Sequence, residues 1–298
     1  MQVVFSARYT VDVGAHVFPT VKYQLLEARL RDQGLLPPTS VVEPLPASWA
    51  ELGLVHTEGY LRKLRTGDMS IADVAQLELP WSPAIVEGFR LMVGGTIAAA
   101  RLARAHGLAV HLGGGLHHAY PEHGEGFCVF NDVAVAIRVL QRDGEIRRAA
   151  VVDLDVHHGN GTAAIFAGDP DVFTLSMHQE HNYPAVKPPS TLDIGLRDGV
   201  GDTEYLARLE GALPQVTGFA PDLVFYLAGA DPYRDDQLGG LALTLDGLRQ
   251  RDAMVFRTCR GAGLPLVVTL AGGYARHVNH TIAIHQATVE EAYAALAT

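Results

Sequence analysis

Short apolar runs recur along the whole chain and constrain its fold more than any other feature of the sequence. The runs are "QVVFS", "LAVHLGGG", "AAVVDLD", "VFTLSM", "DLVFYLAGA" and "PLVVTLAGG". Continuous apolar segments of this length suit strands that are buried on both faces, as in a parallel sheet. We therefore expect these runs to form the strands of a buried sheet.

Segments with a helical spacing of apolar residues lie between several of these runs. The clearest covers 82–105, where a Ser-Pro start precedes the apolar positions and His106-Gly107 offers a stop. Segments of the same kind cover 132–142, 203–216, 244–260 and 278–296. Because strands alternate with helices, the sequence predicts an α/β fold with one open, mostly parallel sheet and helices on both faces.

The chain shows no sign of a boundary between domains. It contains no internal repeat, low-complexity tract or Gly/Ser linker, and 48% of its 298 residues are hydrophobic, which is enough for a substantial core. The Pro-containing stretches 35–46 and 184–189 are interpreted as surface loops. We expect residues 1–298 to form a single domain.

Charge, cysteine content and hydropathy limit the partners and the compartment. With 23 Lys and Arg against 33 Asp and Glu, the net charge of −10 disfavours a nucleic-acid partner. Cys128 and Cys259 form no CxxC pair and are expected to be core thiols in a reducing cytoplasm. The amino terminus lacks the pattern of a signal peptide, and no later stretch is expected to be apolar for long enough to span a membrane.

Several apolar runs end in polar or glycine-rich sequence. The endings are "HLGGGLHHAY", "DLDVHHGNG", "LAGADPYR" and "TLAGGYAR". In open parallel sheets, ligands bind beyond the carboxyl ends of the strands. If these strands are neighbours, their endings line one pocket.

The stretch "VVDLDVHHGNGT", residues 151–162, carries the clearest candidate ligands. Side chains alternate along a strand, so Asp155 and His157 project to the same side and can share a metal ion, with Asp231 as a third ligand. A catalytic zinc takes three protein ligands and leaves one position open for water. A lone carboxylate in such a place more often caps a backbone amide, but its recurrence at several strand ends favours a metal site.

Adjacent His117 and His118 in "GGGLHHAY" form a second cluster. Alone, the pair would be ordinary loop polarity, but beside a metal both are candidate general acids and bases, because imidazole titrates near neutral pH. A histidine in this role needs an acceptor for its other ring nitrogen. Asp153 and Asn160 are the expected acceptors.

Together these residues resemble a known family. The segments "GGGLHHAYPEHGEGFCVFND", "VVDLDVHHGNGT" and "AGAD" are similar to those of the zinc-dependent histone deacetylases, which have the arginase/deacetylase fold, and the resemblance runs from "VFSARY" to "LAGGYAR". "HVFPTVKYQLL" and "HQEHNYP" look most like the class IV branch and its bacterial relatives.

The resemblance implies roles for individual residues. Asp155, His157 and Asp231 match the metal ligands; His118 matches the general base and acid, His117 its electrostatic companion and Asp153 the partner of His117. Asn160 stands where class I enzymes carry an aspartate. The uncharged asparagine should raise the basicity of His118 less than an aspartate would. Tyr274 matches the donor to the carbonyl oxygen, Phe127 and Tyr183 the walls of an acyl-lysine channel, Leu238 its rim, and Gly126 and Gly272 further substrate contacts.

The implied activity is hydrolysis of an acyl-lysine amide, with acetyl or longer acyl groups, assisted by Zn²⁺ or Fe²⁺. A K⁺ site would draw on Asp153, Asp155, His157, Ser176 and Met177. Leu116 and "AGGY" depart from the family pattern, and no acidic residue that grips the substrate backbone is found in "LPWSPAIVEGF". A small acylated amine such as a polyamine is an alternative substrate, and a non-catalytic acyl-lysine binding module is an alternative of another class.

Overall fold

The computed structural model describes residues 1–297, and these contain one parallel sheet. The strands are β1 (Gln2–Val4), β2 (Val41–Val42), β3 (Leu108–His111), β4 (Ala149–Asp153), β5 (Val172–Gln179), β6 (Leu192–Leu196), β7 (Leu223–Leu227) and β8 (Leu266–Thr269). Their order in the sheet is β2-β1-β3-β8-β7-β4-β5-β6, and all strand pairs are parallel. All six apolar runs form strands of this sheet, as predicted.

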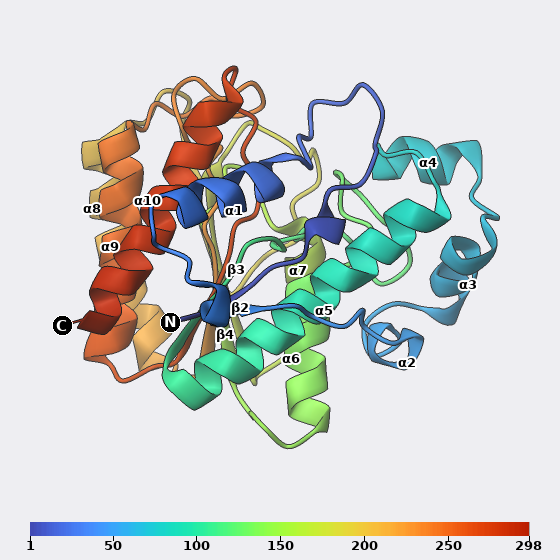
Figure 1. Cartoon of the computed structure of the whole chain (residues 1–298), viewed down its shortest axis with the longest axis horizontal. Helices are drawn as coiled ribbons and strands as arrows, with labels where there is room; N and C mark the ends of the chain where they lie inside the picture. Colours follow the sequence, from blue (N-terminus) through green and yellow to red (C-terminus); the bar gives the residue numbers. More distant parts are fainter. Residues whose placement is uncertain (298) are drawn as a thin grey trace.

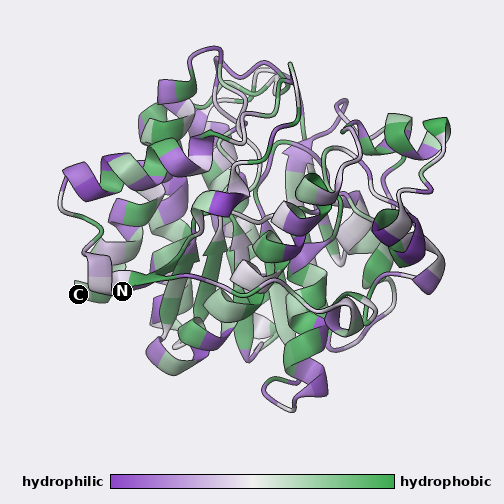
Figure 2. Ribbon diagram, turned by 45° about the vertical axis from the view of Figure 1, so that its right-hand side comes forward, coloured by the Kyte–Doolittle hydropathy of each residue, from purple (hydrophilic) through white to green (hydrophobic). Residues whose placement is uncertain are grey.

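Helices cover both faces of the sheet (Figure 1). They are α1 (Lys22–Asp32), α2 (Trp49–Leu52), α3 (Glu58–Thr66), α4 (Ile71–Leu77), α5 (Pro83–His106), α6 (Asp132–Arg142), α7 (Asn160–Ile165), α8 (Asp202–Gly218), α9 (Leu245–Gly261) and α10 (Val278–Ala297), with short 3-10 helices η1 (Ala7–Tyr9) and η2 (Pro38–Ser40). On one face α5 packs against α6 and β3, and on the other α9 packs between α8 and α10. Figure 2 shows the apolar strands enclosed between these layers.

Local capping explains why the predicted helices begin where they do. Ser82 accepts a hydrogen bond from the backbone N–H of Ile85 and Pro83 takes the first helical position, so α5 starts at the expected Ser-Pro pair. Asn131 caps α6 and Thr244 caps α9 in the same way. The helix predicted over 132–142 has these bounds in the structure.

Helix α5 corrects one expectation from the sequence. By length and composition its 24 residues could cross a membrane, so the expectation that no stretch is apolar enough was wrong. In the structure, 72% of its most apolar window is buried, and it packs against the sheet and α6. A helix that is apolar on nearly all sides suits the core of a large domain.

The sequence did not indicate the elements with short or half-exposed patterns. The stretch 35–46 is not a plain loop, because it contains η2 and β2, which pairs with β1 at the edge of the sheet. In strand β6 only Leu196 is buried, and the other positions alternate between partly exposed and exposed, so the strand shows no continuous apolar run. The stretch 184–189 contains no regular element, as predicted.

Candidate active site

The loops that follow β3, β4, β7 and β8 lie together because these strands are neighbours in the sheet. Strand β4 ends at Asp153, so Asp155 and His157 stand in the loop after the strand and not on the strand itself, as the alternation had suggested. Hydrogen bonds within this loop still bring them to one side, since the backbone N–H of His157 donates to Asp155 Oδ1 over 3.0 Å.

Asp155, His157 and Asp231 form a compact group of three potential metal ligands, whose ligand atoms all lie within 4.8 Å of one another. His157 Nδ1 lies 2.9 Å from Asp155 Oδ1 and 3.5 Å from Asp231 Oδ2. All three residues are buried. The structure therefore brings together the ligands that the sequence proposed.

The surroundings of these three residues favour a bound cation. Burial lowers the pKa of His157, but the adjacent carboxylates of Asp155 and Asp231 outweigh this and raise it to about 10. Burial and the charge of Asp155 raise the pKa of Asp231 to about 7. The two buried carboxylates thus stabilise a positive charge between them, and a divalent metal ion would supply that charge.

One carboxylate oxygen of the group has no hydrogen-bond partner among the described residues and could bind an ion. Asp231 Oδ2 is buried and receives no hydrogen bond from the described residues, whereas Asp231 Oδ1 accepts from the backbone N–H of Val156 over 2.9 Å. Asp155 Oδ2 accepts from the N–H of Gly272 over 2.8 Å. Two carboxylates and one imidazole fit zinc or ferrous iron.

His117 and His118 lie beside this group and are oriented by the expected acceptors. His117 Nδ1 is 2.6 Å from Asp153 Oδ2, and His118 Nδ1 is 2.6 Å from Asn160 Oδ1. The Nε2 atoms of the two histidines are 3.1 Å apart. The two imidazoles therefore meet at their Nε2 atoms.

The two histidines have different environments, which shift their pKa values in opposite directions. Burial lowers the pKa of His117, but the charges of Asp153 and Asp155 outweigh it and raise the pKa to about 9. Burial and the positive charges of His117 and His157 hold the pKa of His118 well below its ordinary value. A neutral imidazole next to a protonated one suits a general base with a cationic companion.

Tyr274 closes the inner end of the site. Its backbone N–H donates to Asp236 Oδ2 over 2.6 Å and its carbonyl accepts from Gln237 Nε2 over 2.8 Å, so the loop after β7 holds the loop after β8. The Tyr274 ring packs at 5.9 Å from Phe127 and 6.4 Å from His157. Burial raises the pKa of Tyr274 well above its ordinary value, so its hydroxyl stays protonated and can donate.

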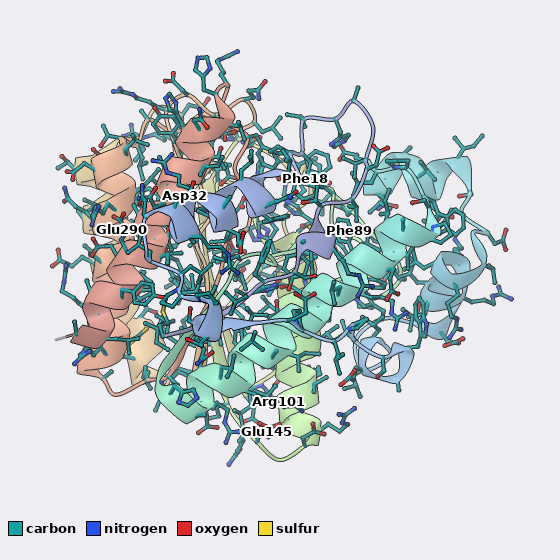
Figure 3. The ribbon with its side chains drawn as sticks, viewed as in Figure 1. Phe18, Asp32, Phe89, Arg101, Glu145 and Glu290 are labelled. Carbon is teal, nitrogen blue, oxygen red and sulfur yellow. The ribbon has the colours of Figure 1, made fainter. Side chains whose placement is uncertain are left out.

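Aromatic side chains line the approach to the site. Tyr183 meets His118 edge-on, with 5.0 Å between ring centroids, and Phe18 stacks on Phe127 at 6.1 Å. Figure 3 shows Phe18 near the start of α1, well above the Arg101–Glu145 ion pair in this view. An outer cavity of about 140 Å³ is lined by Glu78, His118, Gly126, Phe127, His157, Asn182, Tyr183, Leu238 and Tyr274.

A smaller inner cavity continues from this channel and is lined by Phe18, Leu116, Phe127, Asp155, Gly272 and Tyr274 among others. All five residues predicted to contact substrate thus line one or both cavities. Three of the four described non-glycine residues with positive φ also border the site: Glu78 (φ 59°), Phe127 (φ 66°) and Ala271 (φ 52°). Such backbone strain concentrates at functional sites.

The proposed potassium site stays a prediction. Strands β4 and β5 place Asp153 opposite Ser176, with Met177 next to it, and the Asp155 N–H lies 3.2 Å from Asp153 Oδ1.

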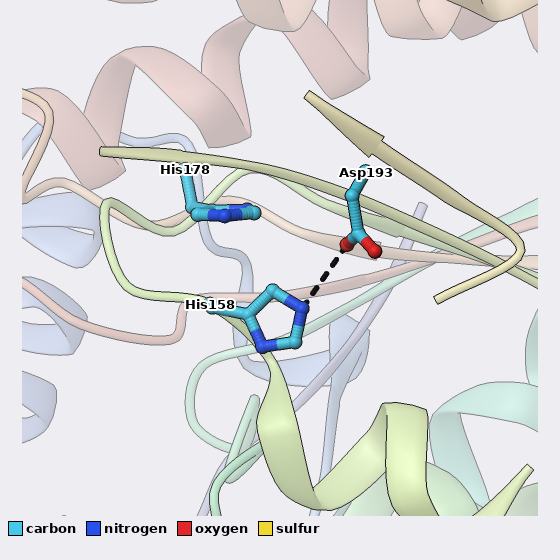
Figure 4. Close-up of side chains that lie close together, drawn as sticks. All are labelled: His158, His178 and Asp193. Atoms are coloured by element: carbon cyan, nitrogen blue, oxygen red, sulfur yellow. Dashed lines mark hydrogen bonds and ion pairs between the residues drawn. The ribbon is translucent and has the colours of Figure 1, made fainter. Parts of the chain in front are cut away.

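A second cluster of possible ligands lies on the other side of the β4 loop (Figure 4). His158 Nε2 is 3.0 Å from Asp193 Oδ1, and the ring of His158 meets that of His178 edge-on at 4.6 Å. His178 Nδ1 in turn lies 3.1 Å from Ser176 Oγ. These contacts tie the loop after β4 to β5 and β6, so the second of the adjacent histidines stabilises the loop that carries His157.

Reasoning from the sequence missed four residues around the site. Asp236 holds Tyr274, Glu78 borders the outer cavity, Glu125 contacts Asn160, and buried Lys22 donates from Nζ to the carbonyl of Ala271 over 2.8 Å. Glu125, inside "HGEGFC", and Lys22, inside "HVFPTVKYQLL", stood in segments already singled out, but neither had been given a role.

Comparisons with known proteins fit this geometry. A sequence profile for the histone deacetylase domain matches residues 16–289. An uncharacterised protein of Picosynechococcus sp. is 44% identical over 274 residues, which cover 91% of this chain and 90% of that protein. Histone deacetylase 2 of Arabidopsis thaliana is 34% identical over 298 residues, covering 95% and 77%. A probable deacetylase of Archaeoglobus fulgidus is 32% identical over 267 residues, covering 83% and 73%.

Solved structures share the fold. The crystal structure of the HDA15 HD domain aligns with a TM-score of 0.81 at 26% identity, covering 97% of this chain and 87% of that one. The structure of an HDAC homolog complexed with SAHA aligns with a TM-score of 0.82 at 24% identity, covering 99% and 88%.

Proposed function

Because the chain belongs to the histone deacetylase family, whose members are metal-dependent hydrolases, we propose that it removes an acyl group from the ε-amino group of lysine. One observation carries the proposal. His118, Tyr274 and two of the proposed ligands, Asp155 and His157, line the inner end of one aromatic-lined channel, and Asp231 lies beside these ligands. A narrow apolar channel suits the aliphatic stem of an acylated lysine.

In the proposed reaction, His118 Nε2 accepts a proton from the attacking water, since His118 is neutral and its Nδ1 is held by Asn160. The Tyr274 hydroxyl donates to the substrate carbonyl oxygen as negative charge develops there. When the amide bond breaks, His118 returns the proton to the leaving amine. His117, whose pKa is raised to about 9, supplies positive charge nearby.

A divalent ion held by Asp155, His157 and Asp231, which we propose to be Zn²⁺ with Fe²⁺ as the alternative, would polarise the carbonyl and lower the pKa of the attacking water.

The test is release of acetyl, octanoyl and myristoyl groups from one lysine peptide by the zinc-reconstituted protein. We expect turnover of at least one substrate, and a fall in kcat on the order of a hundredfold or more in Tyr274→Phe, because one oxyanion donor is lost. His118→Ala removes the base and should reduce turnover further. The absence of turnover on every peptide by the metal-loaded wild-type protein would refute lysine deacylation.

Glu78 favours a small acylated amine as a second candidate substrate. Its side chain is exposed and borders the outer cavity, where a carboxylate can pair with a distal ammonium group. Acetylated polyamines therefore belong in the same assay. If Glu78 reads that ammonium, Glu78→Gln should raise KM for the polyamine about tenfold or more and leave KM for a neutral acetyl-lysine peptide unchanged.

A further inference from the structure

Glu125 lies one hydrogen bond beyond the base of the reaction. Its side chain is 14% exposed, and Asn160 Nδ2 donates to Glu125 Oε1 over 2.6 Å. Asn160 Oδ1 lies 2.6 Å from His118 Nδ1. These three residues, which we call the His118–Asn160–Glu125 triad, form a continuous line of short hydrogen bonds that ends at the imidazole.

The chemistry of the triad fixes the direction of each bond. A carboxylate only accepts, so the amide nitrogen of Asn160 must face Glu125 and its oxygen must face His118. That oxygen also only accepts, so the proton of neutral His118 resides on Nδ1 and Nε2 keeps its lone pair. With the amide reversed, its nitrogen would face Nδ1 and favour a proton on Nε2, which removes the base.

Other contacts hold Glu125 in its acceptor role. Its second oxygen, Oε2, lies 3.1 Å from His123 Nε2 and accepts from Gln76 Nε2 over 3.3 Å. Its backbone exchanges hydrogen bonds with Cys128, with Glu125 N donating to Cys128 O over 3.2 Å and Cys128 N donating to Glu125 O over 2.9 Å. This turn carries the channel residues Gly126 and Phe127, so the carboxylate is fixed to the wall of the site.

The charge state of Glu125 supports the same role. Burial alone would raise the pKa of Glu125, but hydrogen bonds from His123, Asn160 and Gln76 outweigh it and lower the pKa. Glu125 is therefore ionised at neutral pH and has no proton to donate to Asn160.

We infer that Glu125 is a positioning residue for the deacylation reaction, which orients the Asn160 amide and thereby keeps His118 in the tautomer with an unprotonated Nε2. This inference rests on the proposed function, since it assigns a role to a residue that supports its base. Glu125 touches neither the metal ligands nor the reacting atoms, and it acts only through Asn160.

The test uses substitutions that exchange the amide and the carboxylate of the Asn160–Glu125 contact, first singly and then together. Glu125→Gln replaces a group that only accepts with one that can also donate, so the Asn160 amide loses its fixed direction. We expect kcat to fall about tenfold to a hundredfold with KM nearly unchanged, the range found for residues that orient a catalytic group. Asn160→Asp places two carboxylates in contact and should lower kcat at least as far.

The double variant Glu125→Gln with Asn160→Asp restores a single allowed direction, because the new amide donates to the new carboxylate, which accepts from His118 Nδ1. We expect its kcat to exceed that of either single variant by about tenfold or more. Glu122→Gln is the matched control, since Glu122 is 62% exposed and its side chain lies 3.8 Å from His123 without reaching Asn160. That control should keep wild-type kcat.

A second measurement does not depend on turnover. Nitrogen-15 NMR of the zinc-loaded protein reports which imidazole nitrogen of His118 carries the proton. We expect Nδ1–H in the wild type and in the double variant, and a mixture with Nε2–H in Glu125→Gln. Wild-type kcat and an unchanged tautomer in Glu125→Gln would overturn the inference, as would a double variant no better than the worse single variant. If no substrate turns over, the proposed function fails, but the NMR result still decides the role of Glu125.

Discussion

Replacing Gly272 with alanine tests the proposed metal site directly, because the added methyl group would collide with two of the three proposed ligands at once. An ideal Cβ at Gly272 would lie 2.0 Å from Asp231 Oδ2 and 2.5 Å from Asp155 Oδ2. To restore an ordinary contact of 3.4 Å, the carboxylate of Asp231 must retreat by about 1.4 Å. The backbone at Gly272 has no positive φ, so the effect is steric and not conformational.

A displacement of this size is several times the tolerance of about 0.2 Å in metal–ligand distances. We expect Gly272→Ala to weaken zinc binding by about a hundredfold or more, and deacylation to fall in parallel at limiting zinc. Competition with a chromophoric chelator measures the affinity, and metal analysis after dialysis measures the content.

Gly211→Ala is the control for the added methyl group. Gly211 lies within α8, and its Cβ would meet nothing within 4 Å, so this variant should keep zinc affinity and gain about 0.5–1 kcal/mol in stability. Wild-type zinc affinity and turnover in Gly272→Ala would show that Asp155 and Asp231 do not hold the metal in the geometry described.

Two further predictions concern stability. Burial lowers the pKa of Lys22 from 10.5 to about 8, so the unfolded chain binds this proton more tightly and the unfolding free energy should rise with pH between these values. From pH 7.5 to 9.5 we expect the unfolding free energy of the wild type to rise by about 2 kcal/mol more than that of Lys22→Met. Guanidinium denaturation measures both, and an equal pH dependence in the two proteins would contradict the prediction. Fully buried Arg251 donates to Asp252 Oδ1 over 2.9 Å and to the carbonyl of Gly229 over 2.6 Å. Arg251→Met leaves Asp252 buried without this partner, so we expect the unfolding free energy to fall by about 3–5 kcal/mol. A fall below about 1 kcal/mol would show that this ion pair does not stabilise the fold.

The fold was predictable wherever burial imposed a continuous or periodic pattern. A strand covered on both faces must be apolar at every position, which is why β4 and β7 were evident from the sequence. Edge strand β6 is half exposed and β2 has two residues, so neither carries such a pattern. Helix α6 was predicted to the residue because Asn131 caps it and its apolar positions recur with a helical period.

The proximity of the three proposed ligands was predictable because they follow buried strands, and the carboxyl ends of neighbouring parallel strands converge. Lys22 shows where this reasoning ends. A lysine in a helical segment is typical of a solvated surface, yet its ammonium is buried against the rings of Phe18, Tyr23 and Tyr274. Lys22 belongs to the site because the amino-terminal segment crosses the ends of the strands. That tertiary arrangement is not evident from the residues around Lys22 in the sequence.

Asn160 contacts His118, as the sequence predicted, but the sequence did not show what lies on the other side of the Asn160 amide. The asparagine removes a charge from the immediate partner of His118, and the sequence alone suggested only a weaker base. The structure places a carboxylate one hydrogen bond further out, on Glu125, 35 positions away in the sequence. The Asn160 amide donates to the Glu125 carboxylate and accepts from the His118 imidazole, so it fixes the direction of both hydrogen bonds. It cannot pass a proton from His118 to Glu125. In the proposed reaction, His118 therefore keeps its orientation and remains neutral until a water molecule delivers its proton to Nε2.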